Sequence, residues 1–191
     1  MKRFEIHSHT DESNIRNIDS INKIDKLIDK AKKNGLCGIA ITDHESLGIH
    51  MKANKLMKKE EDFKIALGNE IYLVDNRENG QKYYHFILIA KDKEGYEQLR
   101  KLSTNAWYFS YKDRGERVPT LKSELEYVIK QNPGHIIATT ACLGGELSTL
   151  TQIMCDAEDA FDTTTAKFCH SKIVDFILWN KRDGVEKNKI L

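Results

Sequence analysis

The stretch Phe4-Glu5-Ile6-His7-Ser8-His9-Thr10 places two histidines directly after a short apolar run. The apolar run predicts a β-strand, and in extended backbone residues i and i+2 point to the same face. His7 and His9 would therefore present two imidazoles side by side where the chain leaves the strand. This arrangement suits a metal ion, but a single His-x-His motif is a weak signal because surface histidines are common.

The composition is typical of a globular protein with one substantial core. The chain has 191 residues, of which 40% are hydrophobic and 31% are charged. It carries 30 Lys and Arg against 29 Asp and Glu, so it lacks the positive excess of a dedicated nucleic-acid-binding module. A near-neutral domain within a larger nucleic-acid enzyme is compatible with this balance.

The sequence also indicates a cellular compartment. It contains no apolar run long enough to span a bilayer, and its first residues do not resemble a signal peptide, so we expect no membrane association. Its cysteines show no paired spacing, which predicts free thiols in the reducing cytoplasm. These cysteines are Cys37, Cys142, Cys155 and Cys169.

Short apolar segments alternate with segments of helical periodicity, which predicts βα units around a mostly parallel sheet. The expected strands are 4–6, 36–41, 63–67, 71–74, 83–90 and 135–138, and the fourth and fifth form a hairpin around Asn79-Gly80. The expected helices are 21–31, 49–59, 92–109, 121–130 and 154–179, the last interrupted at Thr163–Thr165. Residues 11–19 and 111–118 are expected to be loops.

Polar side chains follow four of these strands. His7 and His9 follow the first, Asp43-His44 the second, Glu70 the third and Cys142 the last. In a barrel of parallel strands the loops at the carboxyl ends converge on one site, so the four signals together are more informative than any one. Imidazole, carboxylate and thiolate ligands favour zinc, manganese or iron over magnesium alone. Such ions can bridge a phosphate and activate a water molecule.

Each candidate also has a structural alternative. The histidine pair would then be a polar strand end, Asp43 a helix N-cap beside an exposed His44, Glu70 a surface carboxylate and Cys142 an ordinary buried residue. His85 opens a strand, so the strand-end argument does not place it, and a structural histidine is an equal interpretation. Three further histidines are interpreted as structural: His50, His135 and His170.

Several spaced motifs resemble the polymerase and histidinol phosphatase (PHP) domain. They are His7–Thr10, Ile39–His44, Gly68–Tyr72 and His85–Lys91. The stretches HFILIAKDKEGYEQL, RVPTLKSEL and ATTACLGGEL are more specifically similar to the N-terminal PHP domain of bacterial DNA polymerase III alpha subunits. Together the motifs cover roughly residues 3 to 150 and occur in the family's order.

The resemblance implies an α/β fold, a distorted seven-stranded (β/α) barrel that holds up to three divalent metal ions. It implies metal ligands at His7, His9, His44, Glu70, His85 and Cys142, with Glu70 as a bridging carboxylate. It also implies an aspartate in the loop after the first histidine pair, for which Asp19 is the best match and Asp11 the fallback. His7, His9, His44 and Glu70 are the candidate catalytic residues.

The chain departs from the family pattern after Cys142. The family supplies a late Asp-x-His pair, and no Asp-x-His follows Cys142 here. We therefore expect residues 1–191 to form a single PHP domain shortened at its C-terminus, with the motifs in 3–150 and a helical tail at about 154–180. Such a barrel would expose sheet edges and bind fewer ions than the family maximum.

Three functions remain open from the sequence. The first is the PHP part of a bacterial-type DNA polymerase III alpha subunit, metal-binding, with phosphoesterase or 3′–5′ exonuclease chemistry in DNA replication. Its partners would be the rest of the alpha subunit or other replication proteins, and DNA would be reached through the parent enzyme. The second is a stand-alone PHP-family metal-dependent phosphatase. The third is a non-catalytic scaffold that binds little metal.

Overall fold

A computed structural model describes residues 3–15, 17–59, 62–78, 80–112 and 115–182, with side chains described up to residue 175. The strands are β1 (Arg3–Ser8), β2 (Leu36–Ile41), β3 (Lys64–Val74), β4 (Tyr84–Ala90), β5 (Tyr111–Lys112), β6 (Glu116–Arg117), β7 (Pro119–Leu121) and β8 (Ile136–Thr140). The helices are η1 (Asp11–Ser13), α1 (Ile24–Lys33), α2 (His50–Met57), α3 (Lys93–Tyr108), α4 (Lys122–Gln131), α5 (Glu146–Asp159) and α6 (Thr163–Arg182).

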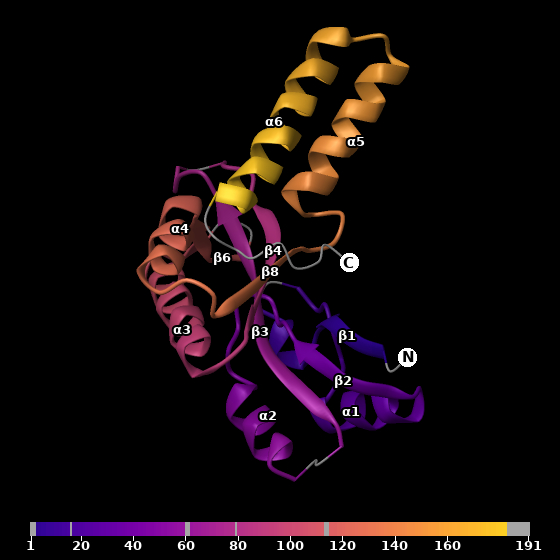
Figure 1. The fold of residues 1–191 in the computed structure, drawn as a ribbon, viewed down its shortest axis with the longest axis vertical. Helices are drawn as coiled ribbons and strands as arrows, with labels where there is room; N and C mark the ends of the chain where they lie inside the picture. The colour runs from indigo at the N-terminus through magenta and orange to yellow at the C-terminus, as the bar shows by residue number, and fades with distance from the viewer. Residues whose placement is uncertain (1–2, 16, 60–61, 79, 113–114, 183–191) are drawn as a thin grey trace.

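The main sheet follows the order β1-β2-β3-β4-β8 (Figure 1). Strand β7 pairs with β3 off this path. The pairs β1–β2, β2–β3 and β3–β7 are parallel, whereas β3–β4 and β4–β8 are antiparallel. Among the described strands the path does not return to β1, so the sheet forms a curled half-barrel. This confirms the predicted α/β barrel-like fold that is incomplete at one end, although the sheet is mixed rather than mostly parallel.

Strand β3 corrects one expectation. The sequence suggested a strand that ends at Leu67 and a second that starts at Ile71, but β3 runs unbroken from Lys64 to Val74. It stays extended because its partner changes: Lys64–Leu67 pair with β2, and Gly68–Leu73 pair with β4. Glu70 therefore lies inside a strand. The predicted hairpin of β3 and β4 is present, although Asn79 within its connection lies outside the described residues.

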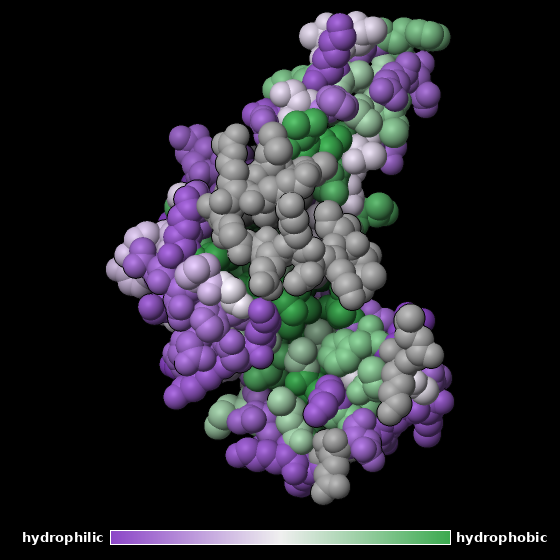
Figure 2. Space-filling model, in the orientation of Figure 1, coloured by the Kyte–Doolittle hydropathy of each residue, from purple (hydrophilic) through white to green (hydrophobic). Residues whose placement is uncertain are grey.

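Two hydrophobic clusters lie between the sheet and the helices, and a smaller cluster of Ala40, Ile87 and Ile89 lies on the sheet itself. In the first, α1 and α2 pack against β2 and the first half of β3 through buried residues such as Ile28, Ala53 and Ile65. In the second, α3 and α4 pack against β4 and the rest of β3 through Leu99, Leu125 and Leu88. Hydrophilic residues cover the side of the molecule where α3 and α4 lie, so these helices are amphipathic (Figure 2).

Other boundaries differ from the sequence-based expectations. Ile21 lies before α1 and is 85% exposed, so it does not join the buried face of that helix. Residues 111–112 and 116–117 form a short antiparallel pair within the expected loop. The break in the last helical region falls before the threonines, because Asp162 accepts hydrogen bonds from the N–H groups of Thr164 and Thr165 and so caps α6.

The helices α5 and α6 lie side by side and project from the rest of the molecule (Figure 1). Within the described residues, no helix combines the length and the apolar character needed to cross a bilayer.

His50 joins the two larger hydrophobic clusters. It begins α2, is 1% exposed, and its ring lies 5.7 Å from the ring of Tyr96 on α3. Burial lowers the pKa of His50 to about 4 from an ordinary value of 6.5. The side chain is therefore neutral in the folded protein at physiological pH.

We predict that His50 makes the fold sensitive to acid. Between pH 6.5 and 4 the unfolded chain binds a proton at His50 that the folded chain does not, so stability falls as the pH falls through this range. The contribution is at most about 3 kcal/mol. Urea unfolding with EDTA present should show a steeper loss for wild type than for His50→Leu. Parallel pH profiles for the two proteins would contradict this assignment.

Candidate metal centre

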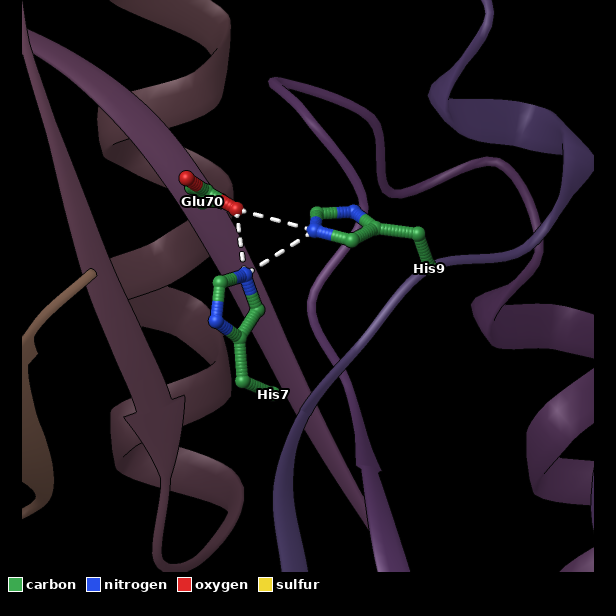
Figure 3. Close-up of side chains that lie close together, drawn as sticks. All are labelled: His7, His9 and Glu70. Carbon is green, nitrogen blue, oxygen red and sulfur yellow. Dashed lines mark hydrogen bonds and ion pairs between the residues drawn. The ribbon is translucent and has the colours of Figure 1, made fainter. Parts of the chain in front are cut away.

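The carboxylate of Glu70 lies at the centre of a cluster of histidines, and its side chain is 1% exposed. Its Oε2 atom is 2.8 Å from His7 Nε2 and 3.1 Å from His9 Nε2 (Figure 3). Its Oε1 atom is 2.7 Å from His85 Nδ1. One buried carboxylate thus contacts imidazoles from two strands and from the loop after β1, which excludes the surface-carboxylate interpretation.

His7 and His9 approach Glu70 from the end of β1. Their Nε2 atoms are 2.9 Å apart, and both rings face the carboxylate, as the i, i+2 spacing predicted (Figure 3). The intervening Ser8 turns away and donates a hydrogen bond to the carbonyl of Ala40 on β2. The histidine pair is therefore directed inward and is more than a polar strand end.

His44 reaches the same carboxylate from the loop after β2. It forms an isolated parallel bridge with Glu70, and its Nδ1 lies 3.7 Å from Glu70 Oε2. Its ring stacks on that of His9, with centroids 4.5 Å apart. The alternative of an exposed His44 is wrong, since the residue is 8% exposed. Nδ1 of His44 is buried and has no hydrogen-bond partner among the described residues.

Asp43 organises the loop after β1 and does not cap a helix. Its carboxylate accepts hydrogen bonds from the N–H and hydroxyl of Thr10 and from the hydroxyl of Ser13. Ser13 Oγ in turn lies 2.9 Å from His9 Nδ1. Asp43 therefore orients His9 through Ser13, a second-layer role that is common around metal ligands. Sequence reasoning missed Ser13, and the alternative of Asp43 as a helix N-cap is wrong.

His85 and Cys142 occupy the side of the cluster formed by β4 and the loop after β8. Cys142 Sγ is 3.6 Å from His85 Nδ1, and the thiol is exposed rather than an ordinary buried residue. The N–H of His85 donates to the carbonyl of Gly144. A Cβ on Gly144 would lie 3.2 Å from the His85 ring, so the loop's close approach favours glycine there.

The two candidate aspartates, Asp19 and Asp11, differ in their distance from the histidine cluster. Asp19 Oδ2 is 3.7 Å from His44 Nε2, at the edge of the cluster. Asp11, the fallback, instead forms an ion pair with Lys23, and its N–H donates to the carbonyl of Asn22. The geometry favours Asp19.

The charge states of Glu70 and His44 suit metal binding. Burial alone would raise the pKa of Glu70, but hydrogen bonds from His7, His85 and His9 outweigh it and hold the pKa well below its usual range. The hydrogen bond to Glu70 raises the pKa of His7. Burial lowers the pKa of His44 to about 4. At neutral pH the carboxylate is ionised and His44 is neutral, the forms in which both bind metals.

Two groups of ligand atoms share Glu70. They are His7, His9 and Glu70, and His44, Glu70 and His85, each with ligand atoms within 4.8 Å of one another. The Glu70 carboxylate therefore belongs to both groups. A third group, Asp92, Glu94 and His135, lies elsewhere and is accounted for by local structure: Asp92 caps α3 and contacts His135. Asp19 and Cys142 flank the second group.

Comparison with known proteins gives consistent relationships. The chain is 44% identical over 189 residues to "Probable DNA polymerase YorL" of Bacillus subtilis, covering 91% of this chain and 14% of that protein. It is 35% identical over 149 residues to DNA polymerase III subunit alpha of Borreliella burgdorferi, covering 73% and 12%. The chain thus spans a small part of the length of these relatives.

A solved structure named as a "putative metal-dependent phosphoesterase" from Bifidobacterium adolescentis aligns with a TM-score of 0.41 at 25% identity, over 55% of this chain and 33% of that chain. The family model for the PHP domain matches residues 5–177, which include all of the clustered side chains described above. The chain therefore belongs to the PHP domain family.

Proposed function

We propose that this chain is the metal-binding PHP part of a bacterial-type DNA polymerase III alpha subunit and that its site cleaves phosphodiester bonds. The observation that carries the proposal is the buried Glu70 carboxylate, held between His7, His9 and His85 with His44 beside it. A buried carboxylate needs partners for its charge, and here all of the partners are imidazoles, which are themselves metal ligands. A divalent ion would satisfy the carboxylate and the imidazoles together.

The donor set fits such an ion. It combines imidazole nitrogen, carboxylate oxygen and a nearby thiol, which suits zinc, manganese or iron. The buried Nδ1 of His44 has no hydrogen-bond partner among the described residues and lies 3.7 Å from Glu70 Oε2, a position from which it could bind an ion. When bound, divalent ions at such a site activate water and neutralise charge on a phosphate.

The chain's own residues then have distinct tasks. Glu70 supplies a fixed negative charge between the two ligand groups. Ser13 and Asp43 hold His9 in one orientation. Cys142 and Asp19 complete the rim on the side of His85 and His44, respectively.

The polymerase setting rests on the relatives. Both relatives described above are named as DNA polymerases, and the similarity extends over 91% of this chain in one and 73% in the other. We propose that the partners are the remainder of an alpha subunit and other replication proteins, that DNA is the substrate, and that the site operates in the cytoplasm.

Replacing Glu70 by glutamine should remove the shared carboxylate charge with little change in shape. We expect wild type to bind at least one equivalent of Zn²⁺ or Mn²⁺ and to hydrolyse bis(p-nitrophenyl) phosphate with Mn²⁺. Glu70→Gln should weaken metal affinity by at least about tenfold and lower hydrolysis by about a hundredfold or more. Metal analysis, calorimetry and the hydrolysis assay measure these effects.

The matched control is Glu97→Gln, which alters an exposed glutamate paired with Arg100 on α3. It should leave both properties unchanged. Wild-type protein with less than one equivalent of metal and no hydrolysis would support a non-catalytic scaffold instead.

Cys142 gives a spectroscopic test of the ligand set. If its thiolate binds the ion near His85, the cobalt-substituted protein should show a thiolate-to-cobalt charge-transfer absorption in the near ultraviolet. Cys142→Ser should abolish this absorption. Cys155→Ser, which removes an exposed thiol from α5, should retain it. Identical spectra for both variants would remove Cys142 from the ligand set.

A further inference from the structure

Glu45, the residue after His44, is unusual in backbone and in environment. Its φ angle is 46°, in the left-handed region that residues other than glycine rarely adopt. Its carboxyl group is completely buried, at 0% exposure. A strained backbone and a buried acid in one residue beside a candidate ligand call for a functional explanation.

The contacts of Glu45 tie three elements together. Its N–H donates to the carbonyl of Glu70 at 3.0 Å. Its Oε1 atom accepts from the N–H of Tyr72 at 2.6 Å. Its own carbonyl accepts from the indole N–H of Trp107, near the end of α3, at 2.7 Å.

These bonds extend the pairing with β3 beyond the end of β2. Strand β2 ends at Ile41, yet the N–H of Glu70 donates to Asp43 and the N–H of Glu45 donates to Glu70. The Glu45 carboxyl then takes the next N–H, that of Tyr72, in place of a backbone carbonyl. The backbone of His44 is thereby held between two fixed points opposite Glu70.

The same contacts fix an aromatic wall of the site. The ring of Tyr72 lies 5.6 Å from the ring of His44 and 5.1 Å from that of His85. The Glu45 carboxyl group therefore binds the backbone of the residue whose ring packs against both imidazoles. Trp107, which is 38% exposed, connects the arrangement to α3.

We propose that Glu45 is a positioning residue of the metal centre, which sets His44 and Tyr72 against Glu70 by accepting the Tyr72 N–H. The proposal rests on the proposed function, because it requires that the cluster bind metal. It assigns Glu45 no contact with the ion or the substrate.

The test compares two variants of the full chain. Glu45→Gln keeps a carbonyl oxygen that can accept from Tyr72, whereas Glu45→Gly loses the acceptor and relieves the left-handed backbone. We expect Glu45→Gln to bind Zn²⁺ within about twofold of wild type and Glu45→Gly to bind about tenfold more weakly. The visible absorption of the Co²⁺ forms should change for Glu45→Gly alone.

Glu45→Gly with the Zn²⁺ affinity and Co²⁺ spectrum of wild type would overturn the proposal, since only backbone strain would then distinguish Glu45. If Glu45→Gly does not fold, Glu45→Met is measured instead. It keeps the length of the side chain and removes the oxygen that accepts from Tyr72, so weaker Zn²⁺ binding and an altered Co²⁺ spectrum support the proposal, and unchanged values overturn it. Wild-type protein that binds metal without hydrolysis would contradict the proposed function and leave this comparison intact.

Discussion

The structure depends on keeping one charged carboxylate buried. Glu70 is 1% exposed in its side chain, and an isolated carboxylate at that depth would take up a proton rather than remain charged. Hydrogen bonds from His7, His9 and His85 reverse that tendency. Each of those imidazoles must lie within hydrogen-bond distance of the Glu70 carboxylate. This requirement constrains how β1, β3 and β4 and the loops beside them are arranged.

Strand β3 meets this constraint by changing partners along its length. Its first half pairs in parallel with β2, and its second half pairs antiparallel with β4. Glu70 lies just after the change, opposite His44 on one side and Ile87 on the other. A side chain at this position can reach ligands from both parts of the sheet. The hydrogen bonds of Asp43 and Glu45 to β3 then extend the first pairing to the site itself.

The sequence predicted the candidate metal ligands better than the residues and strand pairings that position them. The shared orientation of His7 and His9 could be predicted from their spacing alone, because side chains alternate between the two faces of a strand. His85 could not be placed in this way, because its position follows from the antiparallel pairing of β3 with β4. The roles of Asp43 and Ser13 depend on hydrogen bonds between distant residues, which no spacing in the sequence reveals. The extension of β3 through Glu70 was missed for the same reason, since the partner strand decides it.

The most direct test is a crystal structure of the metal-loaded protein with anomalous scattering measured at the Zn or Mn absorption edge. We predict an anomalous peak beside the Nε2 atoms of His7 and His9 and Oε2 of Glu70, and a second peak on the side of His44 and His85. Peaks confined to other groups, such as Asp92, Glu94 and His135, with none in contact with Glu70, would contradict it.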